Sequence, residues 1–242
     1  MSNDPLVIDT YADEGPHFWK ALPPQVHGAI LKVSQGVFYH RDAWLTAALA
    51  ELATDHRGGF HYADFFRDGA EQFRFHYQHA KACGLYTKPT DFVPAIDVEW
   101  SAGDRNSTAT VQQITDCIGS FAAECKKTLG VLPLLYVNCS MMASKGLRGL
   151  LGCLGAWIAR YTPDLPATDT RGDGYHDVGI TLEQIILWQY AGDGVGYLKG
   201  YANRIDAFGK SDMNVAIAPS GPATDAHLAR ATIGVASMVT AT

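Results

Sequence analysis

The sequence has little positive charge and no long apolar run, and these absences exclude several classes of function. Its 242 residues carry 19 Lys and Arg against 25 Asp and Glu, a net charge of −6. This balance, without any basic run, argues against a groove that follows a phosphate backbone, so no nucleic-acid partner is expected. No stretch approaches the roughly 20 apolar residues of a membrane-spanning helix, so no membrane insertion is expected either.

The sequence also lacks the short motifs that hold metals, nucleotides or a nucleophilic serine. Its five cysteines form no CxxC pair and its nine histidines show no HxH or HExxH spacing, so we predict buried free thiols and no catalytic metal or cofactor. There is no GxSxG elbow and no P-loop. The start, MSNDPLVIDTYADEG, has no basic segment followed by an apolar one, so we expect no secretory signal and synthesis in the cytoplasm.

What the chain does have is an alternation of apolar runs with helical segments. Apolar residues make up 47% of it and charged residues 18%, enough for a substantial core. Strands are predicted at 6–9, 28–33, 59–63, 92–99, 132–137, 155–161, 185–190 and 213–218. Helices are predicted at 42–55, 68–84 and 107–130, the last with a Ser/Thr cap and a terminal glycine. This alternation favours parallel strands, in a barrel or in a doubly wound sheet.

Polar residues at the ends of the apolar runs favour the barrel. The C-terminal strand ends of a βα barrel converge on one mouth, where active sites lie. Loops follow strands and are polar in any case, but that does not explain why so many of these residues are acidic, aromatic or amide. We therefore predict an α/β fold: an irregular (β/α)8-like (TIM-like) barrel in a single domain, residues 1–218, followed by a C-terminal extension, residues 219–242. The later segments are short and rich in glycine and aspartate, so the second half should be the irregular one.

Two carboxylates close the most informative run, FVPAIDVEW at 92–100. Asp97 and Glu99 are two residues apart, so on a strand their side chains share one face, roughly 6–7 Å apart, while Ile96 and Val98 face the packed side. Neighbouring carboxylates hinder each other's ionisation, so one can keep a proton while the other is charged. A proton donor beside a negative charge is what cleavage of a glycosidic bond requires. The alternative is a solvated acidic strand end without function.

Eight short segments, in order along the chain, resemble glycoside hydrolase family 25, the Chalaropsis-type lysozymes. They are VIDT at 7–10, AILKVSQG at 29–36, GGFHYAD at 58–64, PAIDVEW at 94–100, PLLYVN at 133–138, AWIARY at 156–161, LWQYAGDG at 187–194 and SDMNV at 211–215. Each segment alone is a weak signal, but the ordered set is specific. The resemblance implies an irregular (β/α) barrel and N-acetylmuramidase activity on the β-1,4 bond between N-acetylmuramic acid and N-acetylglucosamine in peptidoglycan.

The same resemblance implies roles for four acidic residues. Glu99 matches the family's general acid. Asp97 matches the partner that orients the substrate's 2-acetamido group as it attacks the anomeric carbon; the residues alone also allow a covalent nucleophile. Asp9 and Asp212 match residues that shape the charge around this pair, with a structural salt bridge as the alternative for Asp9. Asp206 competes with Asp212, which we prefer because the Met-Asn-Val after it fits the family's last strand.

Aromatic and amide residues at the strand ends are candidates for a sugar-binding groove, since an aromatic face packs against the C–H face of a pyranose. Core packing is the alternative for each aromatic. Strand alternation puts Gln189 opposite Trp188, so the two cannot both line the site, and His61 is expected to be a hydrogen-bonded core residue. The substrate-binding candidates are Tyr62, Tyr136, Trp157, Tyr161, Trp188 and Gln189.

Two other functions remain open from the sequence. A chitinase-like glycosidase also uses a DxE strand, and a non-catalytic barrel could bind sugars, although a binder gains nothing from crowded carboxylates. If the enzyme is a lysozyme without a secretory signal, we expect a phage holin or a secretion machine to bring it to the cell wall. A secreted effector would also require an immunity protein. We expect a monomer.

Overall fold

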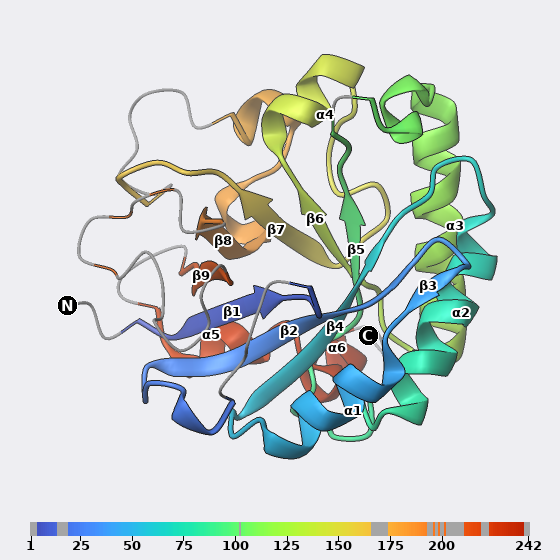
Figure 1. Ribbon diagram of the computed structural model, residues 1–242. Helices are drawn as coiled ribbons and strands as arrows, with labels where there is room; N and C mark the ends of the chain where they lie inside the picture. Colours follow the sequence, from blue (N-terminus) through green and yellow to red (C-terminus); the bar gives the residue numbers. More distant parts are fainter. Residues whose placement is uncertain are drawn as a thin grey trace.

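Eight strands close into a barrel (Figure 1) in the computed structural model, which describes residues 4–13, 19–101, 103–165, 174–192, 196, 198, 201, 211–218 and 223–239. The barrel strands are β1 (Leu6–Thr10), β2 (Val26–Gln35), β4 (His56–Tyr62), β5 (Ala95–Val98), β6 (Leu134–Val137), β7 (Gly155–Ala159), β8 (Ile185–Ala191) and β9 (Asp212–Ala216). Each corresponds to one predicted apolar run. The order around the barrel is β1-β9-β8-β7-β6-β5-β4-β2, and pairing of β1 with β2 closes it. The predicted barrel is confirmed, and a doubly wound sheet is excluded.

Two features of the sheet differ from the expectation of parallel strands. β9 is antiparallel to both of its neighbours, β1 and β8. It begins at the end of the barrel where β8 finishes and runs in the opposite direction to β8. β3 (Tyr39–His40) is a further short strand, antiparallel to the end of β2. Two residues are too few to give a periodic pattern, so the sequence did not indicate β3.

The three predicted helices cover one side of the barrel. They are α1 (Asp42–Glu51), α2 (Gly69–Ala82) and α3 (Val111–Leu129). The Thr110 hydroxyl accepts a hydrogen bond from the amide of Gln113, and Gly130 ends α3 with a φ of 74°, as the predicted cap and terminal glycine require. After the short α4 (Cys139–Lys145), two 3-10 turns, η3 (His176–Val178) and η4 (Leu182–Gln184), precede β8. The second half is irregular as predicted.

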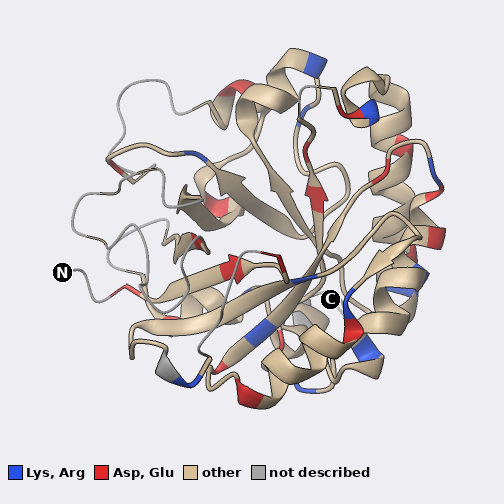
Figure 2. Cartoon of the chain, viewed as in Figure 1, with Lys and Arg blue, Asp and Glu red and all other residues tan. Residues whose placement is uncertain are grey.

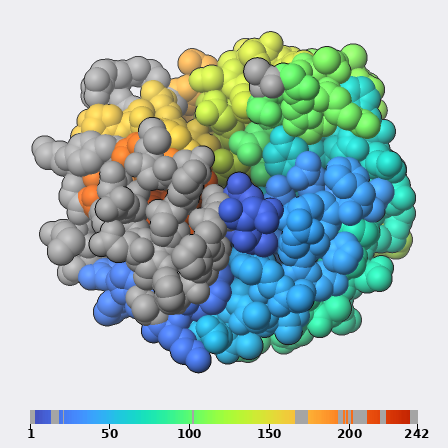
Figure 3. Space-filling view, in the orientation of Figure 1, coloured from blue at the N-terminus to red at the C-terminus, as the bar shows by residue number. Residues whose placement is uncertain are grey.

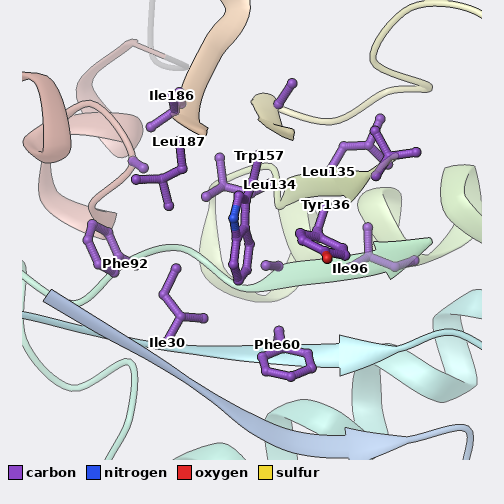
Figure 4. Packing of buried hydrophobic residues seen from close by; sticks show 14 of the residues in the cluster. Ile30, Phe60, Phe92, Ile96, Leu134, Leu135, Tyr136, Trp157, Ile186 and Leu187 are labelled. Atoms are coloured by element: carbon purple, nitrogen blue, oxygen red, sulfur yellow. The ribbon is translucent and has the colours of Figure 1, made fainter. Parts of the chain in front are cut away.

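Large apolar side chains fill the interior of the barrel. Phe60, Tyr136 and Trp157 turn toward one another from three strands (Figure 4), with ring centroids 6.3 Å apart for Phe60 and Trp157 and 4.7 Å apart for Tyr136 and Trp157. Phe92 is fully buried and closes the barrel at the N-terminal ends of the parallel strands. A Cβ atom on Gly28 would lie 2.8 Å from the Phe92 ring, and one on Gly58 would lie 2.9 Å from the Phe92 Cβ. The two glycines therefore make the room that this plug occupies.

The described part of the C-terminal extension packs against the end of the barrel that Phe92 closes. It forms α5 (Asp225–Ala229) and α6 (Ile233–Val239), and Leu228, Ala231 and Ala236 are fully buried. The amide of Val93 donates to the Ala231 carbonyl at 2.7 Å, and Phe92 forms a bridge with Thr232. The extension thus lies under the barrel, at the N-terminal ends of the parallel strands, which we call the floor.

The strands and helices form a single domain. The space-filling view shows segments from the N-terminal and middle parts of the chain side by side on one face (Figure 3). All five cysteines are free thiols, four of them buried, as predicted. Among the described residues, no helix combines the length and the apolar character needed to cross a bilayer.

Candidate active site

Strand register brings the predicted residues to one level at the barrel mouth, the C-terminal end of the parallel strands. Tyr62 pairs with Asp97, Asp97 with Tyr136, and Tyr136 with Trp157. Directly paired residues on neighbouring strands point to the same side of a sheet, so all four side chains enter the barrel. The alternation that brings Asp97 inward leaves Ile96 and Val98 on the outer, packed face, where both are fully buried.

The second pair of acids comes from the two strands that close the barrel. Asp9 of β1 pairs directly with Asp212 of β9. Acidic residues are visible on β1, β5 and β9 (Figure 2). Asp206, the competing candidate, lies outside the described residues. Residues 9, 97, 99 and 212, although far apart in sequence, all line one pocket.

This pocket is the hollow of the barrel mouth. Its volume is about 240 Å³, space for part of a sugar chain rather than for a large ligand. The residues that line it are Asp9, Thr10, Tyr11, Lys32, Phe60, Tyr62, Asp97, Glu99, Tyr136, Trp157 and Asp212. The wall is thus acidic on one part and aromatic on another, a combination suited to holding a carbohydrate next to ionisable groups.

Gln189 joins the two closing acids into one hydrogen-bonded group. Its amide nitrogen donates to Asp9 Oδ2 at 3.2 Å and to Asp212 Oδ2 at 3.0 Å, while its oxygen accepts from the Tyr136 hydroxyl at 2.9 Å and from the Tyr161 hydroxyl at 3.3 Å. Gln189 is fully buried. Every polar atom of its amide is engaged within the protein, and Gln189 is not among the residues that line the pocket.

Asn214 holds Asp9 from the neighbouring strand. Its amide nitrogen donates to Asp9 Oδ2 at 2.6 Å, and its oxygen accepts the indole N–H of Trp157 at 2.6 Å. Trp157 is therefore fixed in orientation by a hydrogen bond to a residue that also orients an acid. Two amide nitrogens, from Gln189 and Asn214, therefore donate to the same carboxylate oxygen of Asp9 and fix its position.

Asp97 and Glu99 lie in an environment that raises their pKa values. Burial raises the pKa of Asp97 well above its usual range; the nearby Glu99 charge raises it further, and Asp9 and Asp212 add to this effect. Burial also raises the pKa of Glu99, while Lys32 lowers it. Asp97 is only 4% exposed, and its Oδ1 is buried without a hydrogen-bond partner. This pair is thus suited to keep a proton at a pH where ordinary carboxylates have lost theirs, and the solvated strand end is excluded.

Lys32 is the cation of the pocket, and the sequence did not mark it as a site residue. Its Nζ lies 4.9 Å from the ring centroid of Tyr62 and 5.6 Å from that of Tyr11, and donates to Gln35 at 3.1 Å. Its charge lowers the pKa of both Asp97 and Glu99. Strand alternation could have indicated it, because Lys32 lies two residues after Ile30, which faces the interior. In the same way, Asn214 lies two residues after Asp212 and shares its face.

The aromatic candidates separate into three groups. Tyr62, Tyr136 and Trp157 line the pocket, and the Tyr62 hydroxyl donates to Asp104 at 2.8 Å. Tyr161 is 47% exposed beside the mouth and reaches the site through Gln189. Trp188 does not enter the mouth: it is fully buried and packs edge-on against Tyr175 with centroids 6.4 Å apart, because the alternation that turns Gln189 inward turns Trp188 outward.

Comparison with known proteins agrees with this geometry. The family model of glycosyl hydrolases family 25 matches residues 8–199. A search among curated protein sequences finds no match. Solved structures with the same fold include a bacterial lysozyme from Streptomyces coelicolor, with a TM-score of 0.68 and 19% identity over 97% of this chain and 98% of that one. A muramidase from Trichobolus zukalii has a TM-score of 0.67 and 16% identity over 97% and 99%.

A third similar structure comes from a virus. The catalytic domain of an endolysin from bacteriophage P40 of Listeria monocytogenes has a TM-score of 0.62 and 20% identity over 96% of this chain and 98% of that one. At these identities the similarity establishes the shared fold. The family match spans most of the chain and includes Asp9, Asp97 and Glu99, so this chain belongs to glycosyl hydrolases family 25 and is a glycoside hydrolase.

Proposed function

We propose that the enzyme is an N-acetylmuramidase that cleaves the β-1,4 bond between N-acetylmuramic acid and N-acetylglucosamine in peptidoglycan. The observation that carries the proposal is the burial of Asp97 and Glu99, with raised pKa values, in a pocket whose other acids are held by amide hydrogen bonds. The fold shared with lysozymes and muramidases supports the choice of substrate.

In this mechanism Glu99 is the general acid. Its raised pKa keeps a proton available for the glycosidic oxygen as the bond to the leaving sugar breaks. It is less deeply buried than Asp97, which suits a group that must reach the scissile oxygen from the wall of the mouth. Lys32 limits the rise in its pKa, so the carboxyl can also be deprotonated and later accept a proton from water.

Asp97 assists the substrate's own 2-acetamido group. In the substrate-assisted route the acetamide oxygen attacks the anomeric carbon. Asp97 accepts a hydrogen bond from the acetamide N–H and stabilises the positive charge that develops on this group. The unpartnered Oδ1 of Asp97 supports this role over that of a covalent nucleophile, because an acceptor awaits a donor there. Asp9 and Asp212, fixed by Gln189, add negative potential near the oxocarbenium-like centre.

Tyr62, Tyr136 and Trp157 provide the aromatic wall against which the sugar packs, with Tyr161 at its exposed edge. Trp188 is not included, since it contacts Tyr175 on the outer side of β8. Gln189 serves the site by positioning.

Mass analysis of the fragments released from purified sacculi tests this function. Muropeptides with a muramic-acid reducing end identify the proposed bond. Fragments with an N-acetylglucosamine reducing end would contradict it. Activity on chitin oligomers but not on sacculi would favour a chitinase-like glycosidase, and binding without release of reducing ends would favour a sugar-binding barrel.

We also propose that the enzyme acts on the cell wall as a monomer brought there by another system, either a phage holin or a secretion machine paired with an immunity protein. Expression in a bacterial cytoplasm with and without a holin tests the first route, which predicts lysis only when both are present. Sedimentation at the 26.2 kDa mass of one chain tests the monomer; a heavier species would contradict it.

A further inference from the structure

Three metal-ligand side chains, His27, Asp55 and Asp225, meet at the floor, at the opposite end of β2 and β4 from the active site, and His56 contacts one of them. His27 lies near the start of β2, His56 starts β4, Asp55 precedes it, and Asp225 begins α5. The strands β2 and β4 are shared with the mouth, where Lys32 and Tyr62 lie. Six residues separate His56 from Tyr62, roughly 20 Å along a strand, so this floor cluster is separate from catalysis.

The distances suit coordination of one ion. His27 Nδ1 lies 3.3 Å from Asp225 Oδ1 and 3.8 Å from Asp55 Oδ2, and one ligand atom from each of these three residues lies within 4.8 Å of the others. His56 Nε2 lies 3.2 Å from the same Asp225 oxygen. Nitrogen and oxygen ligands about 2.0–2.1 Å from a tetrahedral ion are about 3.4 Å from one another, close to these separations.

His56 holds Asp225 in place beside the other two ligands. Its Nδ1 faces the Thr90 carbonyl at 3.0 Å, and its Nε2 faces Asp225 Oδ1 at 3.2 Å. His56 is buried at the start of β4, so this contact ties a carboxylate of α5 to the barrel. Partners of this kind behind a metal ligand fix the orientation of the ligand.

His27 provides an independent observation. Its Nδ1 is buried yet has no hydrogen-bond partner, although two carboxylates are near: Asp55 Oδ2, at 3.8 Å, is beyond hydrogen-bond distance, and Asp225 Oδ1, at 3.3 Å, does not have the geometry of a hydrogen bond. A metal ion on the lone pair of Nδ1 would satisfy that nitrogen and both carboxylates together. The side chains of Asp55 and Asp225 are 73% and 50% exposed, so an ion has a path from solvent.

We propose that His27, Asp55 and Asp225 form a divalent metal site, with His56 holding Asp225 in place, and that the ion fastens the C-terminal extension to the barrel floor. One imidazole nitrogen and two carboxylate oxygens, with water in the fourth position, are a ligand set for Zn²⁺ rather than for Ca²⁺ or Mg²⁺, which prefer oxygen ligands alone. One ligand comes from β2, one from the loop before β4 and one from α5, so the ion stabilises the folded chain over any state in which α5 has detached.

Zinc binding to the full chain, stripped with chelator and then dialysed against Zn²⁺, tests the site. We expect about one retained equivalent in the wild type and a higher Tm with Zn²⁺ than without. Asp225→Asn and His27→Gln should each weaken binding by about tenfold or more and remove the Tm increase. Their metal-free Tm values identify any variant that fails to fold.

The matched control is His79→Gln, which disrupts a second group, His40, Asp42 and His79, that could also hold a metal ion. It should leave zinc binding unchanged. Absence of binding to the wild type would overturn the proposal, and so would binding that survives in both floor variants or disappears in the control. Muramidase activity should be the same with and without Zn²⁺.

Discussion

Two clusters of buried polar side chains in the barrel differ in how completely their hydrogen bonds are satisfied. One is the mouth. The other, which we call the histidine cluster, lies between α2 and strands β2 and β4 and consists of Ser34, His61, Gln72, His76 and Tyr86. Both clusters contain ionisable groups, and Asp97 at the mouth is buried, as His61 and His76 are in the histidine cluster.

In the histidine cluster a single direction of donation satisfies both imidazoles. His61 Nε2–H donates to Gln72 Oε1 at 3.1 Å, so its Nδ1 accepts from Ser34 Oγ at 2.9 Å. Ser34 in turn accepts from His76 Nδ1 at 3.2 Å, and His76 Nε2 accepts from the Tyr86 hydroxyl at 2.6 Å. Both imidazoles are neutral in this arrangement, and burial lowers the pKa of His61 to about 4 and that of His76 well below its usual range.

At the mouth, by contrast, a buried oxygen of Asp97 has no partner, and the pKa of this carboxyl is raised rather than matched by hydrogen bonds. The comparison teaches that burial alone does not mark function. A closed network belongs to the fold, as expected for His61, whereas an incomplete one is left for a ligand to complete.

The largest expected effect is the loss of activity in Glu99→Gln. Removing the proton donor should lower kcat on purified cell walls by about 10³-fold or more, with a Tm close to that of the wild type. Turbidity clearing together with thermal unfolding measures both. Substantial remaining activity would remove Glu99 from its role.

Asp97→Asn should separate activity from stability. We expect activity to fall by about 10²- to 10³-fold because the charge that stabilises the acetamide is lost. Because the folded pKa of Asp97 is raised, this carboxyl costs stability progressively as the pH rises above its unfolded value of 3.8 toward the folded pKa, so at pH 7 the amide should raise Tm by about 2–4 °C. A lower Tm would show that the carboxylate is structurally satisfied after all, and the mouth would not differ from the histidine cluster.

The histidine cluster should make the fold sensitive to acid. Because the folded pKa of His61 is depressed, its stabilising contribution is present above pH 6.5 and is lost as the pH falls toward 4, by about 3 kcal/mol. Urea unfolding of the Asp97→Asn, Glu99→Gln double variant isolates this effect, since the mouth carboxylates titrate in the opposite sense. A free energy of unfolding that stays constant from pH 7 to pH 4.5 would contradict it.

The smallest effect concerns Lys32. Removing its charge in Lys32→Gln should raise the pKa of Glu99 further, so the alkaline limb of the activity profile should move up by about one pH unit. The exposed Lys127→Gln, on α3, is the matched control and should leave the profile unchanged. A shift to lower pH in Lys32→Gln would contradict the electrostatic role.

Much of this architecture could be predicted from the sequence, because it depends on the alternation of side chains along each strand and on the alternation of strands with helices along the chain. The eight apolar runs gave the barrel, and the spacing of Asp97 and Glu99 gave their common face. The direction of β9 could not be predicted, because a short apolar run does not reveal which way its strand points.

Contacts between distant segments were equally hidden. Gln189 was a candidate for contact with substrate, and only the folded chain shows that its amide is occupied by four partners. Trp188, next to it, was also a candidate. Strand alternation allows only one of the two to face inward, but the sequence does not show which one. The floor cluster joins residues 27, 55, 56 and 225, with no local spacing that a metal motif would display.

The central claim is that burial and crowding keep a proton on the pair formed by Asp97 and Glu99 near neutral pH. NMR titration of ¹³C-labelled carboxyl groups, assigned with the Asp97→Asn and Glu99→Gln variants, measures this directly. The account predicts that both carboxyls titrate above the ordinary values of 3.8 and 4.5, and that removing either acid lowers the pKa of the other. Two carboxyls that ionise together at ordinary values would contradict it.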